Sequence, residues 1–379
     1  MSRWSGKYVI GLTGNIGAGK SVVRRMLEHL GAYGIDADTL AHRVIAKGAP
    51  GYKPVVEMFG SWILDQSGEI DRKKLAKIVF ADSDALIRLE KITHPFVFQA
   101  IDFMIKRSSQ AIIVIEAIKL LETDLHKSCD SIWVVTAPPQ VQISRLMRSR
   151  NMSEAEARQR LAVQSPQEKK VAAASVVIQN HSTYEETWKQ VTSAWQKISQ
   201  RVSLPQPTEA PRPAALPGEL HVVRARPRES EEIAALFNRL RKDAKLTKAD
   251  IMAAFGEKAF LLLRSGNRLV GLLAWQVENL VARTTDILID PAVSANQALK
   301  VLTEEMERAS RDLQCEASLV FVPAGLLGDN GLWDGLGYQQ RSPQSLGVLA
   351  WQEAAQESML PGAVLYFKQL RIDRVLRPI

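Results

Sequence analysis

The first half of the chain alternates short apolar runs with longer segments whose apolar residues recur every three to four positions. The apolar runs predict buried strands at 7–13, 32–35, 111–115, 132–136 and 176–179. The periodic segments predict helices at 21–30, 81–107, 139–150, 153–163 and 183–199. Strands and helices in this order are typical of an α/β fold, in which helices cover both faces of a parallel sheet.

The second half has a different order of elements. Its pattern predicts a strand at 219–226, a helix at 230–241 and a hairpin of strands 259–264 and 268–276 around Ser265-Gly266-Asn267. A strand at 284–289, a helix at 295–313 and a strand at 317–322 follow. This order predicts a second domain of the α+β class.

A proline-rich stretch separates the two halves. Residues 204–218 read LPQPTEAPRPAALPG, and five prolines there exclude a continuous helix or a central strand. We therefore expect a first domain at 1–202, a linker at 203–219 and a second domain at 220–379.

Composition narrows the classes of partner. The net charge is +8, but lysines and arginines are scattered among acids, and neither zinc-finger spacing nor an aromatic RNA-binding signature occurs. We expect small anionic substrates and no nucleic acid. No stretch of about 18 apolar residues occurs, so we expect no membrane partner. The two cysteines, Cys129 and Cys315, lie far apart, which fits a cytoplasmic protein.

The most specific motif is a complete G-x-x-x-x-G-K-S between the first predicted strand and helix. It comprises Gly14, Asn15, Ile16, Gly17, Ala18, Gly19, Lys20 and Ser21. Glycines let successive backbone N–H groups point at one phosphate, and the helix N-terminus adds partial positive charge. Lys20 can then bridge the β- and γ-phosphates of ATP, and the Ser21 hydroxyl can bind Mg²⁺.

Two carboxylates follow the next predicted strand, at the edge where such folds bind ligands. Asp36 and Asp38 lie just after 32–35. A carboxylate beside the transferring phosphate can accept the proton of an attacking alcohol. Asp38 could equally cap the helix that follows it, and the spacing does not decide between these roles.

Motifs in a fixed order resemble the signature of dephospho-coenzyme A (dephospho-CoA) kinases. They are GLTGNIGAGKS at 11–21, Gly34-Ile-Asp-Ala-Asp38 with Arg43 downstream, and Thr93-His94-Pro95, followed by shorter matches at 120–122, 142–147, 160–164 and 177–180. The resemblance covers about residues 7–200. It implies a P-loop kinase-type sheet, ATP as donor and the ribose 3′-hydroxyl of dephospho-CoA as acceptor, which is the last step of coenzyme A biosynthesis.

The resemblance also implies residue roles. Asp38 would be the base, with Asp36 in support, and Arg145 would stabilise transition-state charge from a mobile lid near 140–170. The acceptor pocket would include Arg43, His94 and Glu122, and Asn180 would lie near the adenine. The chain departs from the family where Ile118, Lys119 and Leu120 replace a proline and two leucines, where Glu116 replaces an aspartate, and where Ser149 replaces an arginine.

Two local patterns bear on these roles. Arg145, with Arg148 and Arg150, forms a basic stripe that can close on phosphates and exclude water, although Arg148 and Arg150 singly fit a solvated helix face. His94 precedes Pro95, so we expect this pair to end one helical stretch and begin another.

The second half resembles the GNAT acetyltransferase fold. Such enzymes bind the pyrophosphate of acetyl-CoA on a basic, glycine-rich loop before the central helix, whereas this chain has Asp290-Pro-Ala-Val-Ser-Ala-Asn-Gln-Ala298. Backbone amides bind anions less readily without glycines. We expect a degenerate domain that binds a protein partner or an acyl-CoA and transfers no acetyl group.

Two other functions share the phosphate loop. One is a different small-molecule kinase, such as a nucleoside or nucleotide kinase. The other is a nucleotide-gated interaction protein that binds ATP without phosphoryl transfer.

Overall fold

The computed structural model describes residues 3–150, 152–202, 219–241, 244–326 and 330–371. Their packing forms two compact units. The first contains residues up to 20 and residues 31–181, and the second contains residues 21–30 and 182–372. The linker expected at 203–219 lies outside the described residues, apart from Glu219.

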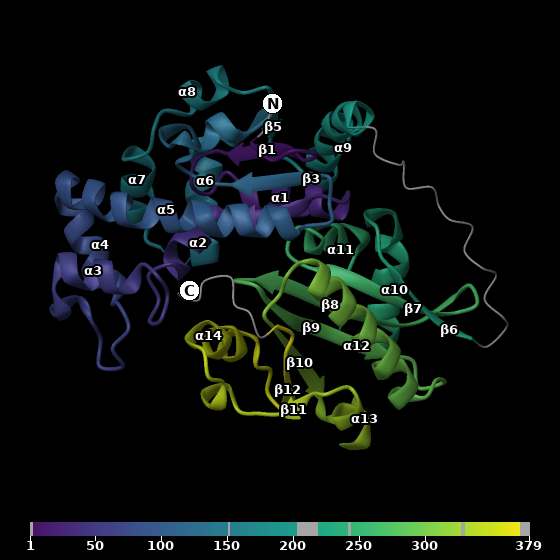
Figure 1. The fold of residues 1–379 in the computed structure, drawn as a ribbon. Coiled ribbons are helices and arrows are strands. Elements are labelled where there is room, and N and C mark those ends of the chain that lie inside the picture. The colour runs from purple at the N-terminus through teal and green to yellow at the C-terminus, as the bar shows by residue number, and fades with distance from the viewer. Residues whose placement is uncertain (1–2, 151, 203–218, 242–243, 327–329, 372–379) are drawn as a thin grey trace. The chain divides into compact units, whose positions relative to one another are not determined.

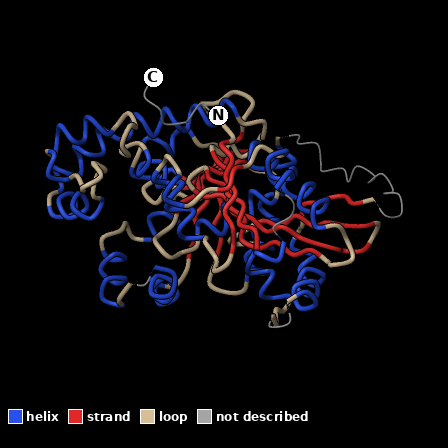
Figure 2. Tube along the Cα trace, turned by 90° about the horizontal axis from the view of Figure 1, so that it is seen from below, coloured by secondary structure: helices blue, strands red, loops and turns tan. Residues whose placement is uncertain are grey.

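The first unit is built on a five-stranded sheet with the order β2-β3-β1-β4-β5. Figure 1 labels its strands β1, β3 and β5, and Figure 2 shows the strands of the chain in red and the helices in blue. Every pairing in this sheet is parallel. The strands are β1 Tyr8–Thr13, β2 Tyr33–Asp36, β3 Ile112–Glu116, β4 Ser131–Thr136 and β5 Val176–Gln179. These strands and their parallel pairing confirm the predicted α/β fold. The prediction succeeds because near-continuous apolar runs are typical of strands that are covered on both faces.

The register brings the ends of three strands into line. Leu12 and Asp36 both lie opposite Glu116, the last residue of β3. The carboxyl ends of β1, β2 and β3 therefore meet at one edge of the sheet, where the phosphate loop follows β1.

The helices of the first unit only partly follow the predictions. They are α2 Ala37–Arg43, α3 Tyr52–Phe59, α4 Arg72–Ala81, α5 Ser83–Arg107, α6 Pro139–Arg150, α7 Glu154–Ala162 and α8 Gln167–Ala172. The helices expected at 81–107, 139–150 and 153–163 are confirmed to within two residues. A helix after Asp38 was one of the two alternatives, and it is present as α2, whereas α3, α4 and α8 were not predicted.

One expectation about α5 is wrong, since the helix runs without a break through His94 and Pro95. A proline removes one backbone N–H and displaces one carbonyl, a cost that a long packed helix can absorb. Here the turns after Pro95 bury Val97, Ala100 and Ile101. Burial of this apolar face outweighs the local preference for a boundary.

The second unit contains a mixed seven-stranded sheet with the order β11-β12-β10-β9-β8-β7-β6. The strands are β6 Leu220–Arg224, β7 Ala259–Ser265, β8 Arg268–Glu278, β9 Val281–Ile289, β10 Ala317–Pro323, β11 Gln339–Gln340 and β12 Ala363–Gln369. Antiparallel pairs connect β6 to β9, and β9 pairs with β10 in parallel over three residues. The predicted hairpin around Gly266 is confirmed.

Helices cover both faces of this sheet. α12, Ala295–Asp312, packs on one face with Leu261 and Leu263 of β7, whereas α10, Ser230–Leu240, and α11, Lys248–Ala254, pack with Phe260 and Leu262 on the other. The unit also holds α1 Lys20–His29, apart from Lys20, with α9 Tyr184–Arg201, α13 Asn330–Gly335 and α14 Leu349–Ser358. Among the helices of the described ranges, none is long and apolar enough to cross a membrane.

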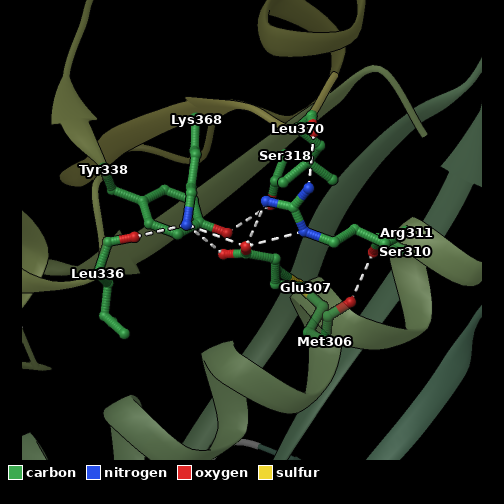
Figure 3. A network of polar contacts seen from close by, with 9 residues as sticks. All are labelled: Met306, Glu307, Ser310, Arg311, Ser318, Leu336, Tyr338, Lys368 and Leu370. Carbon is green, nitrogen blue, oxygen red and sulfur yellow. Dashed lines mark hydrogen bonds and ion pairs between the residues drawn. The ribbon is translucent and has the colours of Figure 1, made fainter. Parts of the chain in front are cut away.

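A polar network fastens α12 to β12 in this unit (Figure 3). The Glu307 carboxylate accepts hydrogen bonds from Lys368 Nζ at 2.7 and 2.9 Å and from Arg311 Nη2 at 2.8 Å. Lys368 Nζ also donates to Leu336 O and lies 5.4 Å from the centre of the Tyr338 ring. A single carboxylate therefore holds two cations that belong to different elements.

Replacing Glu307 by alanine should destabilise the protein, because it leaves the partly buried Lys368 without its carboxylate and removes a partner of the exposed Arg311. We expect a loss of about 2 kcal/mol in the free energy of unfolding, measured by urea denaturation. Glu305→Ala is the matched control on the same helix, since its partner Arg308 is 72% exposed. That control should cost less than about 1 kcal/mol, and equal losses in the two variants would contradict the assignment.

Candidate active site

The phosphate loop spans Gly14–Gly19 between β1 and α1, and glycines are required at two of its positions by close contacts. A Cβ at Gly14 would lie 2.3 Å from Val135 O, and one at Gly19 would lie 2.0 Å from Asn180 Nδ2. Both glycines also have positive φ, at +149° and +93°. The loop backbone thus lies against β4 and the residue after β5, where a side chain could not fit.

Three side chains from later in the chain hold the loop. Arg145 Nη1 donates to Gly17 O and Ala18 O at 3.3 and 3.2 Å, and Asn180 Nδ2 donates to Ala18 O at 2.9 Å. The Ile16 N–H donates to Gln164 Oε1 at 2.9 Å. The sequence therefore places α6, the end of α7 and the residue after β5 around the loop that carries the phosphate motif.

Charge is concentrated at the end of the loop. Lys20 begins α1 with only 7% of its surface exposed, and its charge lowers the pKa of Asp38. Burial, followed by the charge of Arg148, lowers the pKa of Arg145. A buried cation is costly unless an anion compensates it, so Lys20, with the half-buried Arg145 beside the loop, favours a polyanionic ligand here.

The structure distinguishes the two aspartates that follow β2. Asp36 is the N-cap of α2, since its Oδ1 accepts the Thr39 N–H at 2.9 Å. Asp38 lies in the first turn, so the alternative that Asp38 is the N-cap is wrong. Its carboxylate instead accepts the Ile118 N–H at 3.0 and 3.3 Å.

The Asp38 carboxyl has an altered acidity. Burial raises its pKa to about 6, and the nearby charge of Lys20 opposes part of this shift. A carboxylate with a pKa near 6 is ionised at neutral pH and holds a proton more strongly than an ordinary aspartate does. Such a group suits proton transfer from an alcohol.

The other candidate residues lie on several elements around this edge. Arg43 is buried at the last turn of α2, and His94 is partly buried on α5, which packs against α2. Glu122 is exposed at the end of a short helical turn, Leu120–Glu122, and accepts a hydrogen bond from Ser165. Ser21 is exposed in the first turn of α1. Asn15 is 8% exposed and its Oδ1 has no hydrogen-bond partner.

Sequence reasoning missed several residues of this region. Lys170 on α8 is 2% exposed, and its Nζ donates to Ile118 O at 3.0 Å, which also accepts from Thr13 Oγ1 at 3.1 Å. Gln164, the last residue of the family match at 160–164, accepts the Ile16 N–H of the loop, a contact that the resemblance did not imply. A single buried lysine in the polar segment QEKKVA gives no periodic signal, so only the fold reveals it.

The first half of the chain is similar to known proteins. A family model described as dephospho-CoA kinase matches residues 8–186. The dephospho-CoA kinase of Aquifex aeolicus (strain VF5) is 45% identical over 191 residues, which are 50% of this chain and 97% of that protein. The solved structure of TT1252 from Thermus thermophilus is 28% identical, covers 51% of this chain and 97% of its own, and gives a TM-score of 0.46.

The second half has acetyltransferases among its structural neighbours. One is yncA of Salmonella typhimurium, a putative acetyltransferase solved with its cofactor acetyl-CoA. It is 11% identical, covers 41% of this chain and 95% of its own, and gives a TM-score of 0.32. A likeness of this size says nothing about activity.

Gly19→Ala should weaken ATP binding, because the new Cβ would displace the Asn180 amide that holds Ala18 O and because a side chain is strained at a φ of +93°. We expect the Kd for ATP, measured by calorimetry, to rise by at least about tenfold. Gly48→Ala is the control, since Gly48 also has positive φ, at +80°, but has open space around its Cβ position. It should cost about 1 kcal/mol of stability and leave the Kd unchanged. An unchanged Kd in Gly19→Ala would contradict the role of the loop.

Proposed function

Because the chain belongs to the dephospho-CoA kinase family, we propose that Lys20, Asp38 and Arg145 carry out the family's reaction at the carboxyl edge of the parallel sheet. The activity itself follows from that membership. The protein is an ATP-dependent kinase that converts dephospho-CoA into coenzyme A, the last step of coenzyme A biosynthesis. Family membership therefore favours this activity over the nucleotide kinase and the nucleotide-gated interaction protein.

The observation that supports the proposal most directly is the position of Asp38, next to Lys20 and with a pKa of about 6. In the proposed reaction the ribose 3′-hydroxyl oxygen attacks the γ-phosphorus of ATP and gives its proton to Asp38. The bond between the γ-phosphorus and the β,γ-bridging oxygen breaks, and ADP leaves with that bond's electron pair. Asp38 later returns the proton to solvent.

The phosphate loop and Arg145 supply the electrostatic part of the reaction. We propose that the backbone N–H groups of Gly14–Gly19 hold the phosphates, while Lys20 neutralises charge on the β- and γ-phosphate oxygens. Arg145 already contacts the loop through Gly17 O and Ala18 O. We propose that its guanidinium also contacts the transferring group when ATP is bound.

The chain's residues fit a magnesium ion that arrives with the nucleotide. Mg²⁺ prefers oxygen ligands and usually keeps waters and substrate phosphates in its coordination shell, so one protein hydroxyl suffices. Ser21 offers such a hydroxyl, exposed and adjacent to Lys20. When bound, the ion would neutralise charge on the phosphates.

The remaining candidates would bind the acceptor and the base of the nucleotide. We propose that Arg43, His94 and Glu122 line the pocket for dephospho-CoA, a role that their placement around the sheet edge supports. Asp36 would act indirectly, because as the N-cap of α2 it fixes the helix that carries Asp38. Asn180, which contacts the loop through Ala18, would lie near the adenine.

We assign the kinase to residues 1–202 and a second, degenerate GNAT-like domain to 220–379. The Asp290 carboxylate accepts the Ala292 N–H at 3.0 Å and pairs with Arg239 and Arg268. Asp290 thus accepts the Ala292 N–H, a backbone donor in the segment that GNAT acetyltransferases use to bind pyrophosphate. The domain would bind a protein partner or an acyl-CoA. Free thiols at both cysteines fit a cytoplasmic location.

Asp38→Asn should remove the proton acceptor and leave the nucleotide site in place. We expect kcat for coenzyme A formation to fall by roughly 10²- to 10⁴-fold, with the Kd for ATP within about twofold of the wild-type value. The control is Asp124→Asn, which alters a 79% exposed carboxylate and should not change kcat. Wild-type turnover by Asp38→Asn would exclude Asp38 as the base.

The full-length protein should not transfer acetyl groups, because Asp290 takes up a backbone donor in the segment before α12. Acetyl-CoA incubated with the protein and a panel of amines should release no thiol above the spontaneous rate, as followed with a thiol reagent. Release that depends on both enzyme and amine would refute the degenerate assignment without affecting the kinase.

A further inference from the structure

Ile118 connects three elements at the edge of the sheet where the carboxyl ends of β1, β2 and β3 meet. It lies in the turn that follows β3, and its N–H donates to the Asp38 carboxylate of α2. Its carbonyl accepts hydrogen bonds from Thr13 Oγ1 at the end of β1 and from Lys170 Nζ of α8. The backbone of one residue therefore joins the proposed base to a distant lysine.

Lys170 is an unusual residue to bury. Its relative exposure is 2%, and within the described part of the chain it forms no ion pair, its hydrogen bond being to a neutral carbonyl. Burying an ammonium costs free energy unless nearby charge compensates. Burial indeed lowers the pKa of Lys170, while the carboxylates of Glu122 and Asp38 raise it. If Lys170 only stabilised the fold, an apolar residue could fill the same space without the free-energy cost of burying an ammonium group.

We propose that Lys170 is a positioning residue for phosphoryl transfer, which fixes the Ile118 turn so that its N–H holds the Asp38 carboxylate toward the acceptor hydroxyl. This inference rests on the proposed role of Asp38. Proton transfer needs the base within hydrogen-bond reach of the hydroxyl, and displacement by about 1 Å can cost a hundredfold in rate.

Several charges act on Asp38 besides this contact. Lys20 lies at the start of α1, Asp36 precedes α2, Glu116 ends β3 and Lys170 lies on α8. The two acids raise the pKa of Asp38, and Lys20 lowers it, as does the Ile118 N–H. A base is active only when ionised, so activity should be lost as the pH falls through this pKa. Losing the Ile118 contact or the positive charge of Lys170 should move that loss to higher pH.

Lys170→Met tests the proposal in the full-length protein, and Lys169→Met is the matched control, because Lys169 is the exposed neighbour on the same helix. In wild type, kcat/KM should fall as the pH drops through about 6. Lys170→Met should lower kcat by roughly tenfold to a hundredfold, leave KM for ATP within about twofold, and shift the acid limb to higher pH. Lys169→Met should match wild type in all three.

Each other outcome has a distinct meaning. Wild-type kcat and pH dependence in Lys170→Met, with Asp38→Asn inactive, would overturn the positioning role and leave the proposed base intact. A raised KM with unchanged kcat would also overturn it, since Lys170 would then contact a substrate directly. Full activity of Asp38→Asn would overturn both proposals.

A second variant keeps the proposal testable if Lys170→Met does not fold. Ile118→Pro removes the N–H donor and keeps an apolar side chain. It should lower kcat and shift the acid limb to higher pH, with the Kd for ATP preserved. Unchanged kcat and pH dependence would show that the contact with Asp38 has no role in positioning.

Discussion

The active edge of this protein depends on how closely the phosphate loop approaches its neighbours. Gly14 lies so close to the β4 backbone that no Cβ fits there, and a Cβ at Gly19 would displace the Asn180 side chain. Because the loop is pressed in this way, Arg145 and Asn180 can hold its carbonyls, and Gln164 can accept one of its N–H groups. The later helices of the first unit are thereby tied to the nucleotide site.

The same edge brings the base to the phosphates. Parallel register aligns the ends of β2 and β3, so Asp36 caps α2 and Asp38 follows within its first turn. Burial then makes the Asp38 carboxyl a stronger base than an exposed aspartate, and Lys20 keeps it ionised at neutral pH. The position of Asp38 and its raised pKa thus have one origin, because α2 begins directly after β2.

Much of the fold follows from the sequence because the signals are local. Strands such as 111–115 are continuous apolar runs, and the glycine motif has fixed spacing between a strand and a helix. The unpredicted helix α8, Gln167–Ala172, is too short for a periodic pattern to emerge. The helix boundary predicted at Pro95 is wrong because the proline's local preference costs less free energy than the packing of the following residues on α5 contributes.

Contacts between distant residues could not be predicted in the same way. The contact that holds the Asp38 carboxylate comes from the Ile118 N–H, 80 residues downstream of Asp38. The burial of Lys170 depends on where α8 packs, since Lys169 has the same chemistry and is exposed. Such contacts form only after the strands and helices have packed together at the edge of the sheet. The resemblance to a family implied the roles of residues but not the distances between them.

We propose that the phosphate loop holds ATP so that its γ-phosphate faces a hydroxyl beside Asp38. A crystal structure with an unreactive ATP analogue, Mg²⁺ and dephospho-CoA tests it most directly. We expect the phosphates on the Gly14–Ser21 backbone and the ribose 3′-oxygen within about 3.2 Å of the Asp38 carboxylate. An analogue bound elsewhere, or an acceptor hydroxyl directed away from Asp38, would contradict it.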